Sequence, residues 1–349
     1  MTRRLLALLS TAAVLAALAG CGEKEEPATG SGGRPPEPFR VLLDYFPNAD
    51  HAGLFAADGR GDYREAGLDV TLQAPPDPSA PLRLLEAGRA DVAISYTPEV
   101  LLARDRGADL VVVGALVQVP LTSVMALPAS GVRSVADLAG KRVGTAGIPY
   151  QSAYLRTILE DAGVDPGSVR ETNVGFGLTP AMLSRRVDAT LGSFWNYEGV
   201  DLRRRGRDPV ILRMERLGIP TYAELVFVVR RESLDQLGAS RVRRFLQAAA
   251  RGHAALRESP ASGVDPLLEA NPDLDRGLQT AVVEQTVPVF FPADDERPFG
   301  FIEPDDWDAY VLWMVDQGLL EERPERGAGM TNEFLPGEGL QEGVQELQR

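Results

Sequence analysis

The stretch LLEAGRADVAISYTPE, residues 84–99, has a counterpart later in the chain, AMLSRRVDATLGSFWNYE, residues 181–198. Each contains a helical segment, a short basic turn, an aspartate that opens an apolar strand, and then an aromatic residue and a glutamate. The spacings differ too much for a stacked repeat. The pair indicates two similar α/β lobes, each placing an aromatic ring and a carboxylate at the carboxyl edge of its sheet, where such sheets bind ligands. A chance likeness of two strand ends is the alternative.

The segments around these two stretches alternate between strand and helix patterns. Strand patterns include FRVLLDYF (39–46), LDVTLQAP (68–75) and LVVVGALV (110–117), with helical patterns between them. A second unit of the same kind begins near SVADLAGKRVGTAG (134–147), and the chain turns mostly helical after AELVFVVRRES (223–233). Strands that alternate with short helical crossovers predict mainly parallel α/β sheets.

Composition narrows the class of protein. The chain has 349 residues, enough for two domains, and 44% of them are hydrophobic. Its formal net charge is −14. Proteins that bind nucleic acid present basic surfaces to phosphate, so we expect no nucleic-acid partner.

The N-terminus has the pattern of a processing signal. Arg3 and Arg4 precede an apolar stretch that ends in LAGC (18–21), which resembles the bacterial lipoprotein box. We expect residues 1–20 to be a signal peptide and Cys21, the only cysteine, to be lipidated; a plain secretion signal is the alternative. Residues 21–38 are polar and rich in Pro and Gly, which predicts a flexible tether to a membrane. The folded part is then expected outside the cytoplasm.

Reactive constellations are not evident in the sequence. Its histidines, His51 and His253, form no HExxH motif and no Cys/His cluster, and no GxSxG elbow occurs. We therefore predict no catalytic residues, no metal site and no cofactor, although carboxylate pairs for acid–base chemistry remain an alternative.

Aromatic and polar residues instead gather where predicted strands end. The block LDYFPNADHAG (43–53) follows the first strand and contains an acid, two aromatic residues, an asparagine and a histidine. Flat rings stack on planar ligands, and carboxylates accept hydrogen bonds from amino groups. The candidate ligand-binding residues are Asp44, Tyr45, Asn48, His51, Tyr96, Glu99, Trp195, Glu198, Tyr222 and Glu224.

Several stretches resemble the substrate-binding proteins of ABC importers for thiamine pyrimidine precursors. They are LDYFPNADHAGLFAADGRGDYREAGLDV (43–70), GRADVAISYTPEVLLAR (88–104), GKRVGTAGIP (140–149), PTYAELVFV (220–228) and RPFGFIEPDDWDAYVLWMVDQGLL (297–320). That family includes formylaminopyrimidine-binding lipoproteins and shares its fold with fungal pyrimidine synthases. The resemblance extends in order from about Phe39 to about Phe334.

The resemblance implies a two-lobed, periplasmic-binding-protein-like fold of type II, with the ligand cleft between the lobes. It implies that residues 39–125 and 227–349 form lobe 1 and residues 126–226 form lobe 2. It also implies a monomer that delivers a planar heterocycle to a permease and its ATPase. By position, the ligand contacts would fall on Tyr45, Asn48, Tyr96, Trp195, Glu198, Tyr222 and Glu224, with His51 nearby.

The chain departs from the family pattern at the first block, where Tyr45 stands in place of the usual tryptophan. This leaves riboflavin or another flat or anionic nutrient, such as an alkylsulfonate, as an alternative ligand. An extracytoplasmic enzyme on the same fold is a third reading. With one cysteine, the chain cannot form the cysteine-rich iron motif of the fungal synthases.

Overall fold

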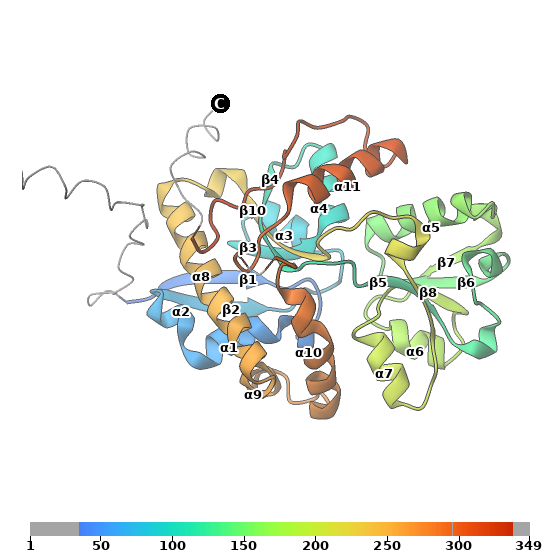
Figure 1. Cartoon of the computed structure of the whole chain (residues 1–349), viewed down its shortest axis with the longest axis horizontal. Coiled ribbons are helices and arrows are strands. Elements are labelled where there is room, and N and C mark those ends of the chain that lie inside the picture. The colour runs from blue at the N-terminus through green and yellow to red at the C-terminus, as the bar shows by residue number, and fades with distance from the viewer. Residues whose placement is uncertain (1–34, 295, 338–349) are drawn as a thin grey trace, which may run out of the picture.

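Two five-stranded sheets organise the chain, one in each lobe (Figure 1). The computed structural model describes residues 35–294 and 296–337. The first sheet has the order β2-β1-β3-β10-β4 and the second has the order β7-β6-β8-β5-β9. In both, the first three strands are parallel, and the fourth, β10 or β5, runs antiparallel to its neighbours. The two lobes therefore share one topology, as the paired stretches predicted.

The elements of the first lobe come from both ends of the described chain. Its strands are β1 Glu37–Leu42, β2 Leu68–Gln73, β3 Val92–Tyr96, β4 Leu110–Val117 and β10 Leu225–Arg230. Its helices are α1 Ala52–Arg60, α2 Asp62–Glu65, α3 Pro81–Glu86, α4 Thr97–Asp105, α8 Gln236–Glu258, α9 Ala261–Ala270, α10 Arg276–Phe290 and α11 Pro304–Asp316.

The second lobe is formed by one continuous segment. Its strands are β5 Thr122–Ala126, β6 Arg142–Thr145, β7 Arg170–Asn173, β8 Ala189–Phe194 and β9 Val210–Arg213, and its helices are α5 Pro149–Asp161, α6 Leu178–Leu183 and α7 Glu198–Arg204. Short 3₁₀ helices occur in both lobes and between them, at Ala49–His51, Pro128–Ser130, Val135–Leu138, Pro166–Ser168, Met214–Leu217 and Arg231–Ser233.

The expected domain limits shift by a few residues. Strand β5 pairs with β8 and β9, so residues 122–125 belong to the second lobe rather than the first. Strand β10 pairs with β3 and β4, which moves Leu225 and Val226 to the first lobe. The chain thus crosses between lobes at 118–121 and 214–224. The first strand begins at Glu37, inside the expected tether, because Glu37 and Pro38 already pair with β2.

The predicted signal peptide, the expected lipidation site Cys21 and most of the predicted tether lie outside the described residues. In the part of the chain that is described, no helix is both long and apolar enough to cross a membrane.

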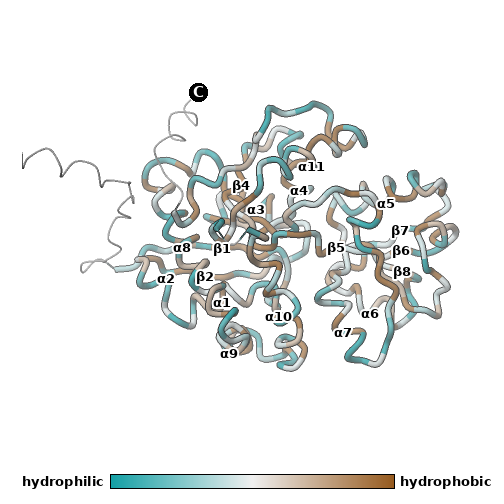
Figure 2. The backbone as a smooth tube through the Cα atoms, in the orientation of Figure 1, coloured by the Kyte–Doolittle hydropathy of each residue, from teal (hydrophilic) through white to brown (hydrophobic). Residues whose placement is uncertain are grey.

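Apolar residues gather in the inner strands of both sheets, while many outer loops are hydrophilic (Figure 2). In the first lobe, α1 packs closely against α8. The ring of Phe245 in α8 stacks on Phe39 of β1, with centroids 5.2 Å apart, and on Tyr63 of α2, at 5.6 Å. Burial of such rings supplies much of the free energy that holds helix to sheet.

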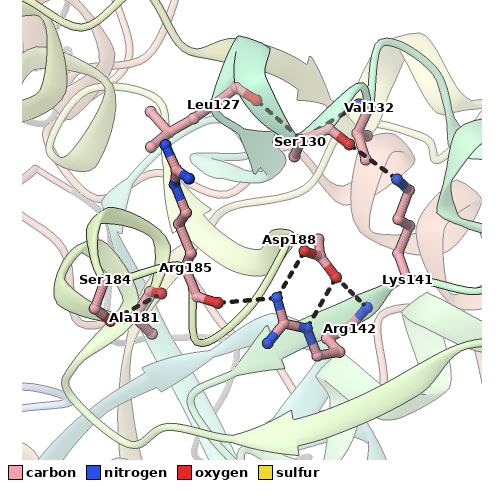
Figure 3. Close-up of polar contacts among 9 residues, drawn as sticks. All are labelled: Leu127, Ser130, Val132, Lys141, Arg142, Ala181, Ser184, Arg185 and Asp188. Carbon is pink, nitrogen blue, oxygen red and sulfur yellow. Dashed lines mark hydrogen bonds and ion pairs between the residues drawn. The ribbon is translucent and has the colours of Figure 1, made fainter.

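An arginine–aspartate pair at the amino edge of the second sheet fixes the start of β8 (Figure 3). The Arg142 backbone N–H and Nε donate to Oδ2 of Asp188, at 2.9 and 3.0 Å, and Nη2 donates to Oδ1 at 2.8 Å. The same Nη2 donates to the carbonyl of Arg185 at 2.9 Å. The first lobe has the equivalent arrangement: the backbone N–H of Arg40 donates to Asp91 at 2.7 Å, and its Nη2 donates to the carbonyl of Gly88 at 3.3 Å.

Candidate ligand-binding site

The ends of strands from both sheets line a cleft between the lobes. It contains about 480 Å³ of space, its open mouth included. The first lobe contributes the segment after β1 and the end of β3, and the second lobe contributes the segments after β6 and β8. The lining residues are Asp44, Tyr45, Phe46, Asn48, Asp50, Tyr96, Ala146, Ile148, Gln151, Leu178, Gly192, Phe194, Tyr197 and Glu198.

Asp44 is held in the cleft wall by two donors. The Tyr96 hydroxyl donates to its Oδ2 at 2.7 Å. His51 Nε2 lies 2.8 Å from its Oδ1, and His51 Nδ1 accepts from the backbone N–H of Asn48 at 3.3 Å. Since Nδ1 is the acceptor, the proton of the neutral ring is on Nε2 and is donated to Asp44. The carboxylate of Asp44 is therefore preorganised as a fixed negative group.

The local sequence explains this geometry. Asn48 caps the 3₁₀ helix Ala49–His51: its Oδ1 accepts from the backbone N–H of Asp50 at 2.8 Å. Asn48 and His51 form a capping box, which turns the chain sharply after β1. The expected ligand residues Asn48 and His51 thus shape the wall, and only Asn48 is in the lining.

Aromatic rings from both lobes meet over the cleft. Tyr45 lies edge-on to Phe176 of the second lobe, with ring centroids 4.4 Å apart. Phe46 lies 6.5 Å from the ring of Tyr197, also of the second lobe. The hydroxyl oxygen of Tyr45 is buried and has no hydrogen-bond partner among the described residues. It is free to bond a ligand.

Two further carboxylates face the same space. Burial raises the pKa of Asp50 to about 6, and burial raises the pKa of Glu198 to about 7. Glu198 begins α7, and its Oε2 accepts from the backbone N–H of Phe194 at 2.7 Å. With Asp44, these groups give the cleft three acidic side chains. Such a site suits a ligand that donates hydrogen bonds or carries positive charge.

Two of the expected ligand residues hold the crossing segments together instead. Glu224 is fully buried, and its Oε2 accepts from the backbone N–H groups of Leu121 and Thr122 at 2.7 and 2.9 Å. The Tyr222 hydroxyl donates to the same oxygen at 3.2 Å. Burial raises the pKa of Glu224 to about 7. Neither residue is in the cleft lining.

Trp195 and Glu99 also lie outside the lining. Trp195 donates from Nε1 to the carbonyl of Pro120 at 2.9 Å, and the guanidinium of Arg213 lies 4.3 Å from its ring centroid. Glu99 is buried at the start of α4, where burial raises its pKa. Of the ten expected residues, the structure brings Asp44, Tyr45, Asn48, Tyr96 and Glu198 into the cleft.

No sequence pattern pointed to Gln151 as a lining residue. Its Oε1 accepts from the backbone N–H of Ala146 at 2.8 Å. Gly192 has a φ of 104°, and a Cβ there would lie 2.2 Å from Gln151 Nε2, so only glycine admits this side chain. Asp50 was not among the candidate residues either, but it lies within the block LDYFPNADHAG (43–53) that contains several of them. Among the described residues, no group of three or more His, Cys, Asp or Glu could hold a metal ion.

Comparison with known proteins places the chain in a family. The family model described as NMT1/THI5 like matches residues 48–262. The formylaminopyrimidine-binding protein of Halalkalibacterium halodurans is 32% identical over 82% of this chain and 87% of its own length. The 4-amino-5-hydroxymethyl-2-methylpyrimidine phosphate synthase of Legionella pneumophila is 28% identical over 85% of this chain and 92% of its own.

A solved structure confirms the predicted fold. The alkanesulfonate-binding protein SsuA from Xanthomonas axonopodis pv. citri, bound to MOPS, superposes with a TM-score of 0.63 at 21% identity, over 85% of this chain and 99% of its own. At that identity the likeness concerns the fold alone, which is the two-lobed fold of periplasmic binding proteins. The sequence and the fold agree, and the chain belongs to the NMT1/THI5-like family.

Proposed function

We propose that this protein is the substrate-binding component of an ABC importer and that it captures a thiamine pyrimidine precursor. The observation that supports this most directly is the set of three acidic side chains, Asp44, Asp50 and Glu198, in one aromatic cleft between two lobes. A planar aminopyrimidine offers amino hydrogens to carboxylates and a flat face to aromatic rings. The formylaminopyrimidine-binding relative supports the same ligand class.

The acidic lining of the cleft disfavours an anionic ligand, such as an alkylsulfonate. A sulfonate in this cleft would meet the fixed carboxylate of Asp44 and would force Asp50 and Glu198 to bind protons. The alkanesulfonate-binding neighbour therefore shares the fold without supporting its ligand here. Riboflavin is a flat heterocycle without charge, so the acidic lining does not exclude it, and its affinity has to be measured beside that of the pyrimidine.

We propose binding without catalysis, although the Legionella relative is named as a synthase. The only cysteine is Cys21, so the cysteine-rich iron motif expected of the fungal synthases cannot form. Incubation with an aminopyrimidine, followed by mass spectrometry, should return the ligand unchanged. Conversion of the ligand would support the enzyme reading.

Isothermal titration calorimetry of the full chain tests the ligand. We expect formylaminopyrimidine to bind, and riboflavin and an alkanesulfonate to bind at least tenfold more weakly, a difference of about 1.4 kcal/mol. Saturation at about a hundred times Kd should stabilise the fold by about 2.7 kcal/mol. Preference for riboflavin would transfer the proposal to that ligand, and no binding of any heterocycle would refute it.

A matched pair of variants tests the carboxylates. Glu198→Gln keeps the side chain's shape and replaces one acceptor by a donor, which should weaken aminopyrimidine binding by about 1.5–3 kcal/mol. Glu160→Gln makes the same change at an exposed position of α5 and should leave the affinity unchanged. Equal affinities of the two variants would remove Glu198 from the site.

We also propose that lipidated Cys21 anchors the protein outside the cytoplasm, where it serves a permease and its ATPase. In the native host, Cys21→Ala should move the protein from the membrane fraction to the soluble extracytoplasmic fraction, because the predicted tether offers no other anchor. Membrane retention of the variant would contradict lipid anchoring.

A further inference from the structure

The side chain of Asn196 crosses from the second lobe to the first. Its Nδ2 donates to Oδ1 of Asp50 at 2.6 Å and to Oγ1 of Thr286 at 2.7 Å. The Thr286 hydroxyl donates to the carbonyl of Val282 at 2.7 Å, so its oxygen is the acceptor toward Asn196. Both amide hydrogens of this fully buried residue are thus committed to the other lobe.

These contacts connect elements that move apart when a two-lobed protein opens. Asn196 lies in the turn between β8 and α7, Asp50 lies in the 3₁₀ helix after β1, and Thr286 lies in α10. Helix α7 contacts α10 across the lobes. A second bond, from Gln279 Nε2 to the Tyr197 hydroxyl at 3.2 Å, joins the same two regions. Of the acceptors of Asn196, Asp50 alone also lines the cleft.

We infer that Asn196 is a positioning residue, which fixes Asp50 as a negative acceptor toward the ligand only while the lobes are closed. The inference rests on the proposed function for the class of ligand, but the bonds that carry it are within the protein. Separation of the lobes breaks both bonds, and water then solvates Asp50. Ligand recognition by Asp50 and lobe closure are therefore coupled through one carboxamide.

The other end of the carboxamide opposes closure. The Oδ1 of Asn196 is buried and has no hydrogen-bond partner among the described residues. An acceptor that loses water without gaining a donor raises the free energy of the closed state. This cost offsets part of what the two bonds of Nδ2 contribute to closure, so open and closed states are both populated without ligand, and a ligand that binds the closed state shifts the balance toward it. The amide cannot rotate to relieve this cost, because Oδ1 would then face the carboxylate of Asp50.

The charge on Asp50 depends on this environment. Burial raises its pKa to about 6, the Asn196 donor lowers it, and Asp44 raises it. Glu198 also lines the cleft, and its pKa is raised by burial and, to a smaller extent, by the negative charge of Asp50. The donor of Asn196 is thus one of the groups that keep Asp50 negative at neutral pH.

Asn196→Asp tests the inference, because it places a second carboxylate against Asp50. At pH 8 we expect formylaminopyrimidine to bind this variant at least about tenfold more weakly than the parent chain, and at pH 5, where the pair can share a proton, within about threefold. Affinities are compared as variant-to-parent ratios at each pH, because the ionisable groups near Asp50, which are Asp44, His51 and Glu198, are the same in both proteins. Asn196→Ala removes the donor without adding a charge, so at pH 8 its loss should be smaller than that of Asn196→Asp.

Thr286→Val is the matched control. It removes the second acceptor at nearly constant shape and leaves the bond to Asp50, so we expect a change of at most about threefold. Equal, pH-independent losses in Asn196→Asp and Asn196→Ala would show a merely structural role and overturn the inference. Circular dichroism confirms that each variant is folded.

Small-angle scattering separates this inference from the proposed function. We expect the radius of gyration of ligand-free Asn196→Asp to increase relative to the parent between pH 5 and pH 8. If the parent binds no heterocycle, the proposed function fails, and the scattering comparison alone decides the inference. A variant that matches the parent across this range refutes the role of Asn196.

Discussion

Arg185 occupies in the second lobe the left-handed backbone position that Gly88 occupies in the first. Their φ values are 58° and 70°, and the carbonyl of each accepts from an arginine of the equivalent strand, Arg142 of β6 or Arg40 of β1. Among the described residues, Arg185 is the only non-glycine residue with a positive φ. The turn requires this conformation, and the second lobe adopts it with a side chain that disfavours it.

Arg185→Gly should therefore stabilise the protein. Relief of the left-handed conformation is worth about 1–2 kcal/mol, and the added freedom of the unfolded chain costs about 0.4–1 kcal/mol, so we expect a net gain of about 0.5–1 kcal/mol. Urea unfolding measures it. Arg185→Ala keeps the strained backbone and should show no gain. If the two variants are equally stable, the turn is not strained.

Tyr45→Phe should separate ligand binding from stability. The Tyr45 hydroxyl is buried without a partner, so its removal should leave the free energy of unfolding unchanged or raise it by about 1 kcal/mol. A ligand that accepts from this hydroxyl should lose about 0.5–1.5 kcal/mol of binding free energy. Tyr63→Phe is the control, because its hydroxyl is equally unpartnered but lies outside the cleft lining. Calorimetry should show a loss for Tyr45→Phe alone.

Trp195→Phe should affect stability rather than binding. The change removes the bond from Nε1 to Pro120 in the crossing segment, at a cost of about 0.5–1.5 kcal/mol. Trp307→Phe removes a similar bond, to the carbonyl of Ala328, within the first lobe. Neither variant should change the Kd for the ligand more than about threefold. A tenfold loss in Trp195→Phe would restore the stacking role that the sequence suggested.

Stability should fall as the pH rises from 6 to 8. Burial raises the pKa values of Glu198 and Glu224 to about 7, so the folded state binds more protons than the unfolded state above pH 4.5. The contribution of each group to the free energy of unfolding therefore falls by about 1 kcal/mol between pH 6 and pH 8. Burial lowers the pKa of His253 to about 4. This group therefore acts at lower pH, where the free energy of unfolding decreases as the pH falls from 6.5 toward 4. Urea unfolding of ligand-free protein at pH 6, 7 and 8 should give decreasing free energies; a flat profile contradicts the assignment.

Gly53→Ala should destabilise the first lobe. A Cβ at Gly53 would lie 2.3 Å from ring atoms of His253, in the close contact between α1 and α8. Overpacking of this kind costs about 1–3 kcal/mol. In a His253→Ala background the same substitution should cost much less, because the ring is gone. An equal cost in both backgrounds would exclude this contact as the cause.

The repeated topology and the place of five of the ten candidate residues in the cleft could be predicted from the sequence because both depend on local pattern. Asp91 and Asp188 open equivalent strands, and the block at 43–53 forms one turn whose side chains converge. The direction of Trp195 could not be predicted, because it directly follows the last residue of β8, and successive side chains along an extended chain point to opposite faces. Strand β8 has a register shift against β5, and Phe194, one residue earlier, is the ring in the cleft.

Glu224 lies outside the cleft lining for a different reason. An acid at the start of a strand resembles a ligand acceptor, but its donors are the N–H groups of Leu121 and Thr122, about a hundred residues earlier. Such a partnership depends on the two crossing segments lying side by side, which no local pattern records. Gln151 of α5 lines the cleft for a similar reason, because Gly192 of the distant strand β8 leaves space for its side chain.

The position of β10 has a consequence for the order in which the chain acquires structure during synthesis. Because β10 lies between β3 and β4, the first sheet stays in two pieces until residue 230 is available. All five strands of the second sheet are available by residue 213. The lobe that begins later can therefore finish first, and it can provide a folded body beside which the last strand of the other sheet inserts.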